Sequence, residues 1–142
     1  MSKQTYHDEE QDSFPVSATA DIPAFGLVKF AGAAITPLAA ITDVPVGADN
    51  TGSVVTLSSA TTSINLLNKC GTMKVVQEAA IVPGAEVTIG GTTFTSVRTV
   101  TGITGATIRI LGIKVDRQGL GNGSAGDVIE IMPFPSYVKV IA

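Results

Sequence analysis

Reactive side chains are scarce in this chain of 142 residues, which contains no tryptophan, one cysteine and one histidine. The single cysteine, Cys70, excludes an internal disulfide and fits synthesis in a reducing compartment. Because His7 is the sole histidine, the rest of the chain lacks the base that a Ser-His-Asp or Cys-His arrangement needs. We therefore expect no catalytic residue and no enzymatic activity.

Candidate sites for metals and cofactors are equally weak in the sequence. His7 lies among acidic residues, but one histidine with no cysteine nearby makes a poor metal site. Glu78 and Glu86 are better explained as carboxylates on solvated strand faces than as an acid–base pair. The glycine-rich stretch at 119–127 has no GK[ST] sequence and no helix after it, so we expect a flexible loop that holds no phosphate. We predict no metal and no cofactor.

Charge is low and unevenly distributed. Charged residues make up 15% of the chain, below the proportion of about a quarter that is usual in globular proteins. Residues 1–21 hold five acids and one base, and the remainder holds seven acids and eight bases. No cluster of Lys and Arg predicts a nucleic-acid partner, and no run approaches the roughly 18 apolar residues of a membrane helix. The first residues also lack the basic and apolar regions of a secretory signal, so we expect synthesis in the cytoplasm.

The abundant residues are those that favour β-strands. Val, Ile and Thr together number 46, against 7 Leu, and 15 glycines provide turns. Side chains branched at Cβ are stiff and pack well on a pleated surface. This composition predicts an all-β fold, either a small β-sandwich or a partly open β-barrel, with at most one short helix.

We divide the chain into an extended N-terminal arm, residues 1–20, and a β domain, residues 21–142. The arm is polar and acidic, which is typical of a tail that is disordered when alone. It also carries apolar residues that can order on a partner surface. We predict as partner-binding anchors Tyr6, Phe14, Pro15 and Val16.

Local patterns place strands and turns within the β domain. A strand begins at Leu27, with Leu27 and Lys29 on one face and Val28 and Phe30 on the other. Residues 59–70 form the one plausible helix, because Gly71 follows as a stop signal.

Further along, we expect a tight hairpin turn at Gly90-Gly91 and a strand around residues 106–115. In that strand Ile113 and Val115 should point away from Lys114, and Gly112 should mark a bulge or a bend. The chain should close with two strands separated by Pro133 and Pro135.

One short unit recurs along the chain. "IPAFGLVKFAG" (22–32), "IVPGAEVTIGG" (81–91) and, more weakly, "SAGDVIEIM" (124–132) each place a tight turn just before an alternating strand. Turn residues set the backbone geometry and carry no reactive group, so the unit is architectural. Three irregular copies are too few for a solenoid.

The order of these stretches resembles that of bacteriophage capsid cement proteins, also called head decoration proteins. The resemblance covers about residues 20–132 and rests on turn glycines and alternating aliphatic residues. The matching positions are Leu27-Val28, Gly71 to Val75, Ile81-Gly84-Val87, and Gly126-Asp127 with Ile129 and Ile131. The longer, more acidic leader and the additional end "MPFPSYVKVIA" depart from the family pattern.

The resemblance implies a structural role in a virion. Cement proteins lie on the outer face of the expanded head, often as trimers, and bridge copies of the major capsid protein. We therefore expect the major capsid protein as a partner and a homo-oligomer, with a trimer favoured. The alternative is a receptor- or glycan-binding module of a phage tail or fibre, against which the lack of tryptophan counts.

Overall fold

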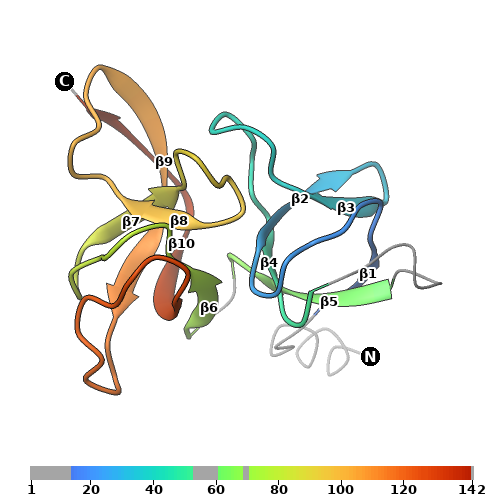
Figure 1. Cartoon of the computed structure of the whole chain (residues 1–142). Helices are drawn as coiled ribbons and strands as arrows, with labels where there is room; N and C mark the ends of the chain where they lie inside the picture. The colour runs from blue at the N-terminus through green and yellow to red at the C-terminus, as the bar shows by residue number, and fades with distance from the viewer. Residues whose placement is uncertain (1–13, 53–60, 69–70, 142) are drawn as a thin grey trace, which may run out of the picture.

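A computed structural model describes residues 14–52, 61–68 and 71–141 of the chain (Figure 1). These residues form ten β-strands and no helix, and hence no helix that could cross a membrane. The strands are β1 (Phe14–Ser17), β2 (Leu27–Ala31), β3 (Ala34–Pro37), β4 (Gly47–Asp49), β5 (Thr61–Leu66), β6 (Met73–Val76), β7 (Glu86–Ile89), β8 (Val97–Thr99), β9 (Ala106–Val115) and β10 (Val128–Ile141).

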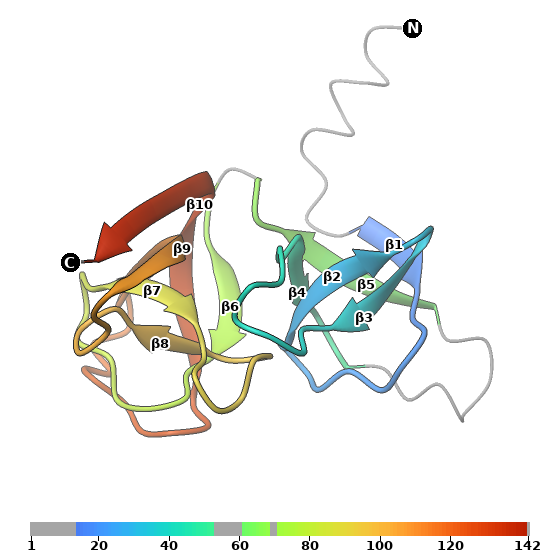
Figure 2. The same cartoon turned by 90° about the horizontal axis from the view of Figure 1, so that it is seen from above.

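The strands build two five-stranded antiparallel sheets that lie side by side (Figures 1 and 2). The N-terminal sheet has the order β1-β5-β4-β2-β3, and the C-terminal sheet has the order β6-β10-β9-β7-β8. Each sheet curls toward a barrel, because a parallel bridge joins its first edge to its last: Ala18 to Ile35, and Gln77 to Val97. The predicted all-β fold is confirmed.

The two sheets are copies of one design. Their strand orders are identical when β6 to β10 are matched in turn with β1 to β5. β1 begins at residue 14 and β6 at 73, and β2 begins at 27 and β7 at 86, so both pairs are 59 residues apart. The edge bridges agree with this offset, since Ala18 and Gln77 are also 59 residues apart. The chain is therefore a tandem pair of five-stranded units.

Hydrogen bonds at the same end of each unit support the equivalence. The Phe25 amide donates to the Asp49 carbonyl at 2.8 Å, and the Gly84 amide donates to the Lys114 carbonyl at 2.8 Å. The reverse bonds join the Asp49 amide to Gly26 at 2.9 Å and the Lys114 amide to Ala85 at 3.0 Å. Asp49 and Lys114 thus occupy the same position in the two units. We call this end of each unit its pole.

The recurring sequence unit is confirmed as an architectural device. Each copy forms a turn closed by a backbone hydrogen bond, at residues 23–26, 82–85 and 124–127. The third residue of each turn has a positive φ: 59° at Phe25, 88° at Gly84 and 88° at Gly126. β2, β7 and β10 begin directly after these turns. Phe25 adopts a backbone conformation that normally favours glycine.

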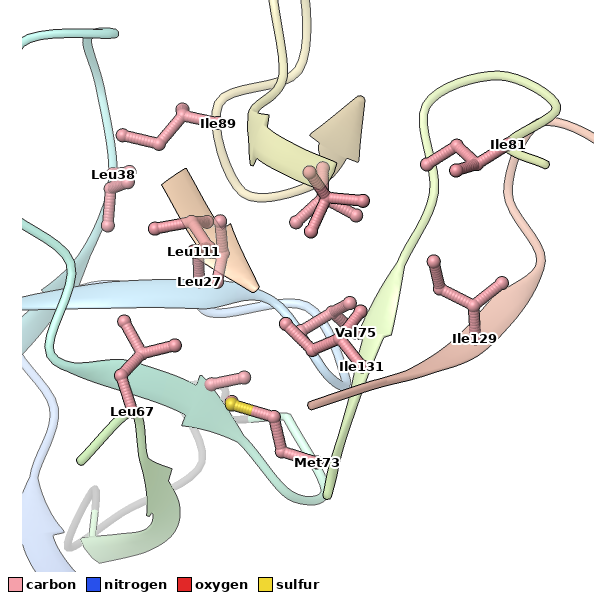
Figure 3. Close-up of a cluster of buried hydrophobic side chains, with 13 residues drawn as sticks. Leu27, Leu38, Leu67, Met73, Val75, Ile81, Ile89, Leu111, Ile129 and Ile131 are labelled. Atoms are coloured by element: carbon pink, nitrogen blue, oxygen red, sulfur yellow. The ribbon is translucent and has the colours of Figure 1, made fainter. Parts of the chain in front are cut away.

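Two apolar cores hold the units together. The smaller core fills the N-terminal unit and includes Ile22, Val28 and Ile35. The larger core fills the C-terminal unit and also takes in side chains from the N-terminal unit, Leu27 and Leu38 among them (Figure 3). Adjacent residues of β2 consequently serve different cores, which agrees with the predicted faces of that strand.

Glycine is required at one position in each unit where the backbones of two paired strands approach closely. A Cβ atom on Gly47 would lie 2.0 Å from the Asn65 carbonyl oxygen, and one on Gly112 would lie 2.2 Å from the Met132 carbonyl oxygen. These two glycines are equivalent, because Gly47 pairs with Val28 of β2 and Gly112 pairs with Val87 of β7.

The predicted helix at 59–70 is wrong. Residues 61–66 form β5, which pairs with both β1 and β4, and residues 67–68 form a turn. Ile64 is fully buried in the smaller core, and the Thr62 hydroxyl donates to the Asp49 carboxylate at 2.8 Å. Burial of a β-branched segment between two partner strands outweighs the weak helical signals.

Two finer expectations about the C-terminal unit are also corrected, and a third is confirmed. The β7–β8 connection is a loop over residues 90–96 in place of a tight turn at Gly90-Gly91. β10 is one strand whose pairing with β9 is irregular between Pro133 and Tyr137. The expected bulge near Gly112 is present, since Leu111 is an extra residue opposite β7. That bulge reverses the alternation, so Lys114 points inward.

We expect Gly47→Ala and Gly112→Ala each to lower the free energy of unfolding by about 3 kcal/mol, because the new methyl group would overlap a carbonyl oxygen of the neighbouring strand. Urea denaturation measures this change. Gly102→Ala is the control: its site is open and only its φ of 85° is unfavourable, so it should cost about 1 kcal/mol. Equal losses of stability at all three glycines would contradict the close approach of the strands at Gly47 and Gly112.

Candidate interaction surfaces

The structure places three of the four predicted anchors in β1. Phe14 pairs with Ile64, Pro15 with Ser63, and Val16 with Thr62. Tyr6 lies outside the described residues. The C-terminal part of the predicted arm is therefore a strand of the N-terminal sheet, and the role of these residues as partner contacts stays a prediction.

A buried lysine organises the pole of the C-terminal unit. The Lys114 side chain is 4% exposed, and its ammonium donates to three backbone carbonyls, of Ile81 at 2.8 Å, Gly121 at 3.0 Å and Asn122 at 2.8 Å. It also donates to the Gln77 carboxamide at 3.2 Å. Burial lowers the pKa of Lys114, and the negative charges of Asp116 and Asp127 offset part of that shift.

The loop at 119–127 is held in place and is not the flexible loop that we expected. The buried Gln77 donates through its side chain to the carbonyls of Asn122 at 3.1 Å and Ser124 at 2.8 Å. The Asp116 carboxylate accepts the amides of Leu120 and Gly121, both at 2.8 Å. Because the polar partners lie on other segments, the nine loop residues alone gave no sign of them.

The carboxylate of Asp116 remains charged in this arrangement. The amides of Gly121 and Leu120 lower its pKa, with a smaller contribution from the nearby Lys114 ammonium. Asp127 completes the loop by accepting the Ser124 amide at 2.7 Å. The pole of the C-terminal unit thus presents a fixed loop in which Leu120 is exposed above a carboxylate.

The pole of the N-terminal unit uses an acid where the C-terminal unit uses a base. Asp49 is fully buried and accepts the amides of Thr51 at 2.9 Å and Gly52 at 2.6 Å, besides the Thr62 hydroxyl. Asp49 satisfies amide donors, whereas Lys114 satisfies carbonyl acceptors. Each charged side chain closes one barrel end by pairing with backbone groups.

An apolar groove of about 410 Å³ lies where the two units meet. Its lining residues are Phe30, Val44, Pro45, Val46, Leu66, Leu67 and Asn68 from the N-terminal unit, and Arg109, Leu111 and Phe134 from the C-terminal unit. Arg109 is the one charged residue among them. Phe30 is 46% exposed and Val44 is 56% exposed at the rim. Exposed apolar surface of this kind marks protein contacts.

A second hollow, of about 480 Å³, lies beside the C-terminal pole and is lined by both charged and apolar residues. Two of its charged residues, Arg117 and Glu130, form an ion pair, and the Thr72 hydroxyl also donates to Glu130. Arg117 and Thr72 lower the pKa of the Glu130 carboxyl. Across the described ranges, no three Asp, Glu, His or Cys side chains come together as metal ligands would.

Glu78 has a structural role that the sequence did not reveal. We interpreted it as a solvated carboxylate, but it accepts the amides of Gly91 at 2.7 Å, Thr92 at 2.6 Å and Thr93 at 2.8 Å. Partial burial acts to raise the pKa of Glu78, but the three amides together hold it below its ordinary value. Glu86, its suggested companion, instead pairs with Lys139 at 2.8 Å.

Comparison with known proteins gives one informative result. No protein-family model matches the chain, and no curated protein sequence matches it significantly. Among solved structures, the fold is similar to that of the N base of the head fiber gp8.5 of bacteriophage phi29, with a TM-score of 0.60 and 15% sequence identity. The match covers 86% of this chain and 92% of the other chain. At this identity the likeness establishes a common fold.

We expect Lys114→Met to lower the free energy of unfolding by about 3 kcal/mol, because it leaves buried carbonyl oxygens without a donor. Hydrogen exchange should also accelerate in residues 119–127. Lys139→Met removes a partly exposed ion pair and should cost no more than about 1 kcal/mol. Equal effects of the two substitutions on the loop would contradict a special role for Lys114.

Glu78 should make stability depend on pH under acidic conditions. Because its pKa is lower in the folded state than the ordinary value of 4.5, its contribution is present above that value and is lost as the pH falls through the folded pKa. Urea titrations between neutral and acidic pH should show wild type and Glu78→Gln converging as the pH falls. A constant difference at every pH would contradict this linkage.

Proposed function

We propose that this chain is a structural protein of a phage virion that binds the outer surface of the head and bridges copies of the major capsid protein. The observation that carries the proposal is the fold that 86% of this chain shares with the base of a phage head fiber. The resemblance to capsid cement proteins in the order of turns and strands supports the same class of function. The protein would be made in the host cytoplasm and act on the virion.

The described surfaces suit a binding protein. The rim of the groove is apolar and nearly uncharged, which is the composition found at the centre of protein interfaces. In the second hollow, the charged side chains of Arg117 and Glu130 pair with each other. A rigid body of two fused barrels is also suited to a brace, because neither unit can move far without breaking the shared core.

Bridging would gain strength from repetition. One interface of standard size buries about 1,600 Å² in total and suffices for specific binding. When a homo-oligomer, with a trimer favoured, engages several capsid subunits at once, modest individual contacts combine into strong binding. Residues 1–13, with Tyr6 as an anchor, would extend the reach of each copy, and Phe14 to Val16 would contact the partner from β1.

A second candidate is a base that fixes a fibre or another appendage to the head. It is favoured by the described role of the matched protein as the N base of a head fiber. The receptor- or glycan-binding alternative stays a prediction, and a glycan array with the isolated protein tests it.

Purified protein mixed with expanded, empty heads that lack it should co-sediment with them and raise the temperature at which the heads open. Unexpanded heads are the control and should bind less. Failure to bind expanded heads of the phage that encodes the protein would contradict the proposed function.

Deletion of residues 1–13 tests the arm without removing β1, which pairs with β5. We expect the truncated protein to unfold at the same urea concentration but to occupy fewer sites on expanded heads. Unchanged occupancy would remove this segment from the mechanism.

A further inference from the structure

We propose that copies of this chain bind head to tail, with Leu120 of one copy inserted into the apolar groove between the two units of the next copy. The proposal concerns contact between copies of the chain, so it can be tested without a capsid. Four observations carry it: the continuity of the groove with the core, the covered state of the equivalent site, the fixed position of Leu120, and the charges on the two surfaces.

The groove is the open end of the contact that already joins the two units. Leu67 and Leu111 belong to the larger core, and both also line the groove. A side chain inserted there would extend an existing apolar core. Burial of such a side chain is favourable in proportion to the apolar area removed from water.

The equivalent site in the C-terminal unit shows what kind of side chain covers it. Phe30 of β2 corresponds to Ile89 of β7, since the two are 59 residues apart in strands that match. Ile89 is fully buried, with Leu38 of the other unit beside it (Figure 3). Phe30 remains 46% exposed. The N-terminal unit therefore presents the same surface without the leucine that covers its counterpart.

Leu120 is a suitable occupant because it is exposed and yet fixed. Its side chain is 72% exposed, while its amide is held by Asp116 and the next residue, Gly121, is held by both Asp116 and Lys114. A pre-positioned apolar side chain loses little conformational entropy on binding. Such anchors that fill a pocket dominate the energy of protein interfaces.

The charges of the two surfaces are complementary. Arg109 is the one charged residue among the described residues that line the groove. The carboxylate of Asp116 lies at the base of Leu120 and is kept ionised by the loop amides. Insertion of Leu120 would bring the carboxylate toward the guanidinium, which favours this occupant over an apolar side chain flanked by a base.

A single chain cannot make this contact with itself. The loop between β9 and β10 lies at the lower left of Figure 1, whereas the linker between β3 and β4, which carries Val44, lies at the top centre, between the two units. The contact joins two different surfaces, so it is heterologous and either closes into a ring or continues as a filament. Because the surfaces differ, a cross-linking experiment can distinguish this contact from a two-fold dimer.

Cross-linking of mixed variants tests the proposal. In a Cys70→Ser background, Val44→Cys and Leu120→Cys chains are purified separately. A short bismaleimide is then added to each variant alone and to an equimolar mixture of the two. The mixture should yield a cross-linked dimer, whereas neither variant alone should. Val140→Cys, whose parent side chain is 75% exposed but lies outside both surfaces, is the matched control and should cross-link with neither.

Sedimentation equilibrium gives the energetic test. Leu120→Asp and Val44→Asp should each raise the dissociation constant between copies by at least about tenfold, and Val140→Asp should leave it unchanged. Urea denaturation of each variant establishes that the fold is retained. A monomer at the highest soluble concentration, cross-links only between identical variants, or an oligomer insensitive to Leu120→Asp would each overturn the proposal.

Discussion

Burial of aliphatic side chains from the first unit in the core of the second is the contact on which the structure depends. Leu27 and Leu38 of the N-terminal unit pack in the larger core together with Ile89 and Leu111 of the C-terminal unit. This contact turns two small barrels, each marginal at about 60 residues, into one body. The groove adjoins this contact, because Leu67 and Leu111 of the same core line it together with the exposed Phe30 and Val44.

The duplicated design solves one problem in two chemically opposite ways. A barrel end brings backbone groups together where water is excluded, and each group needs a partner. The N-terminal unit supplies a carboxylate, Asp49, that accepts amides, and the C-terminal unit supplies an ammonium, Lys114, that donates to carbonyls. The strand order is nevertheless the same in both units, and both have the close strand contact, at Gly47 and at Gly112. The poles of the two units thus differ in charge, whereas their strand frame is the same.

The sequence predicted the features that depend on local chemistry. The excess of Val, Ile and Thr over Leu predicted an all-β fold, and the proline and glycine turns before β2, β7 and β10 were recognised as one device. The helix at 59–70 was predicted wrongly, because its weak helical signals compete with pairing to β1 and β4, which are distant in sequence. Long-range pairing is not visible in a local pattern.

The surfaces were harder to predict than the fold for the same reason. The pattern placed Lys114 on the face of β9 opposite Ile113 and Val115 and predicted a bulge near Gly112, but it did not show that the Lys114 side chain is buried. The glycine loop gave no sign of order, since Gln77 and Lys114, which hold it, come from other segments of the chain. The groove requires residues from both units and has no signature in either alone.

The central claim is that these fused barrels act by covering and joining the outside of a phage head. Electron cryo-microscopy of expanded heads, with and without added protein, tests it most directly. The account predicts additional density on the outer face that spans the junctions between capsid subunits and fits the two barrels. Particles with no added density, or with density confined to the tail, would contradict it.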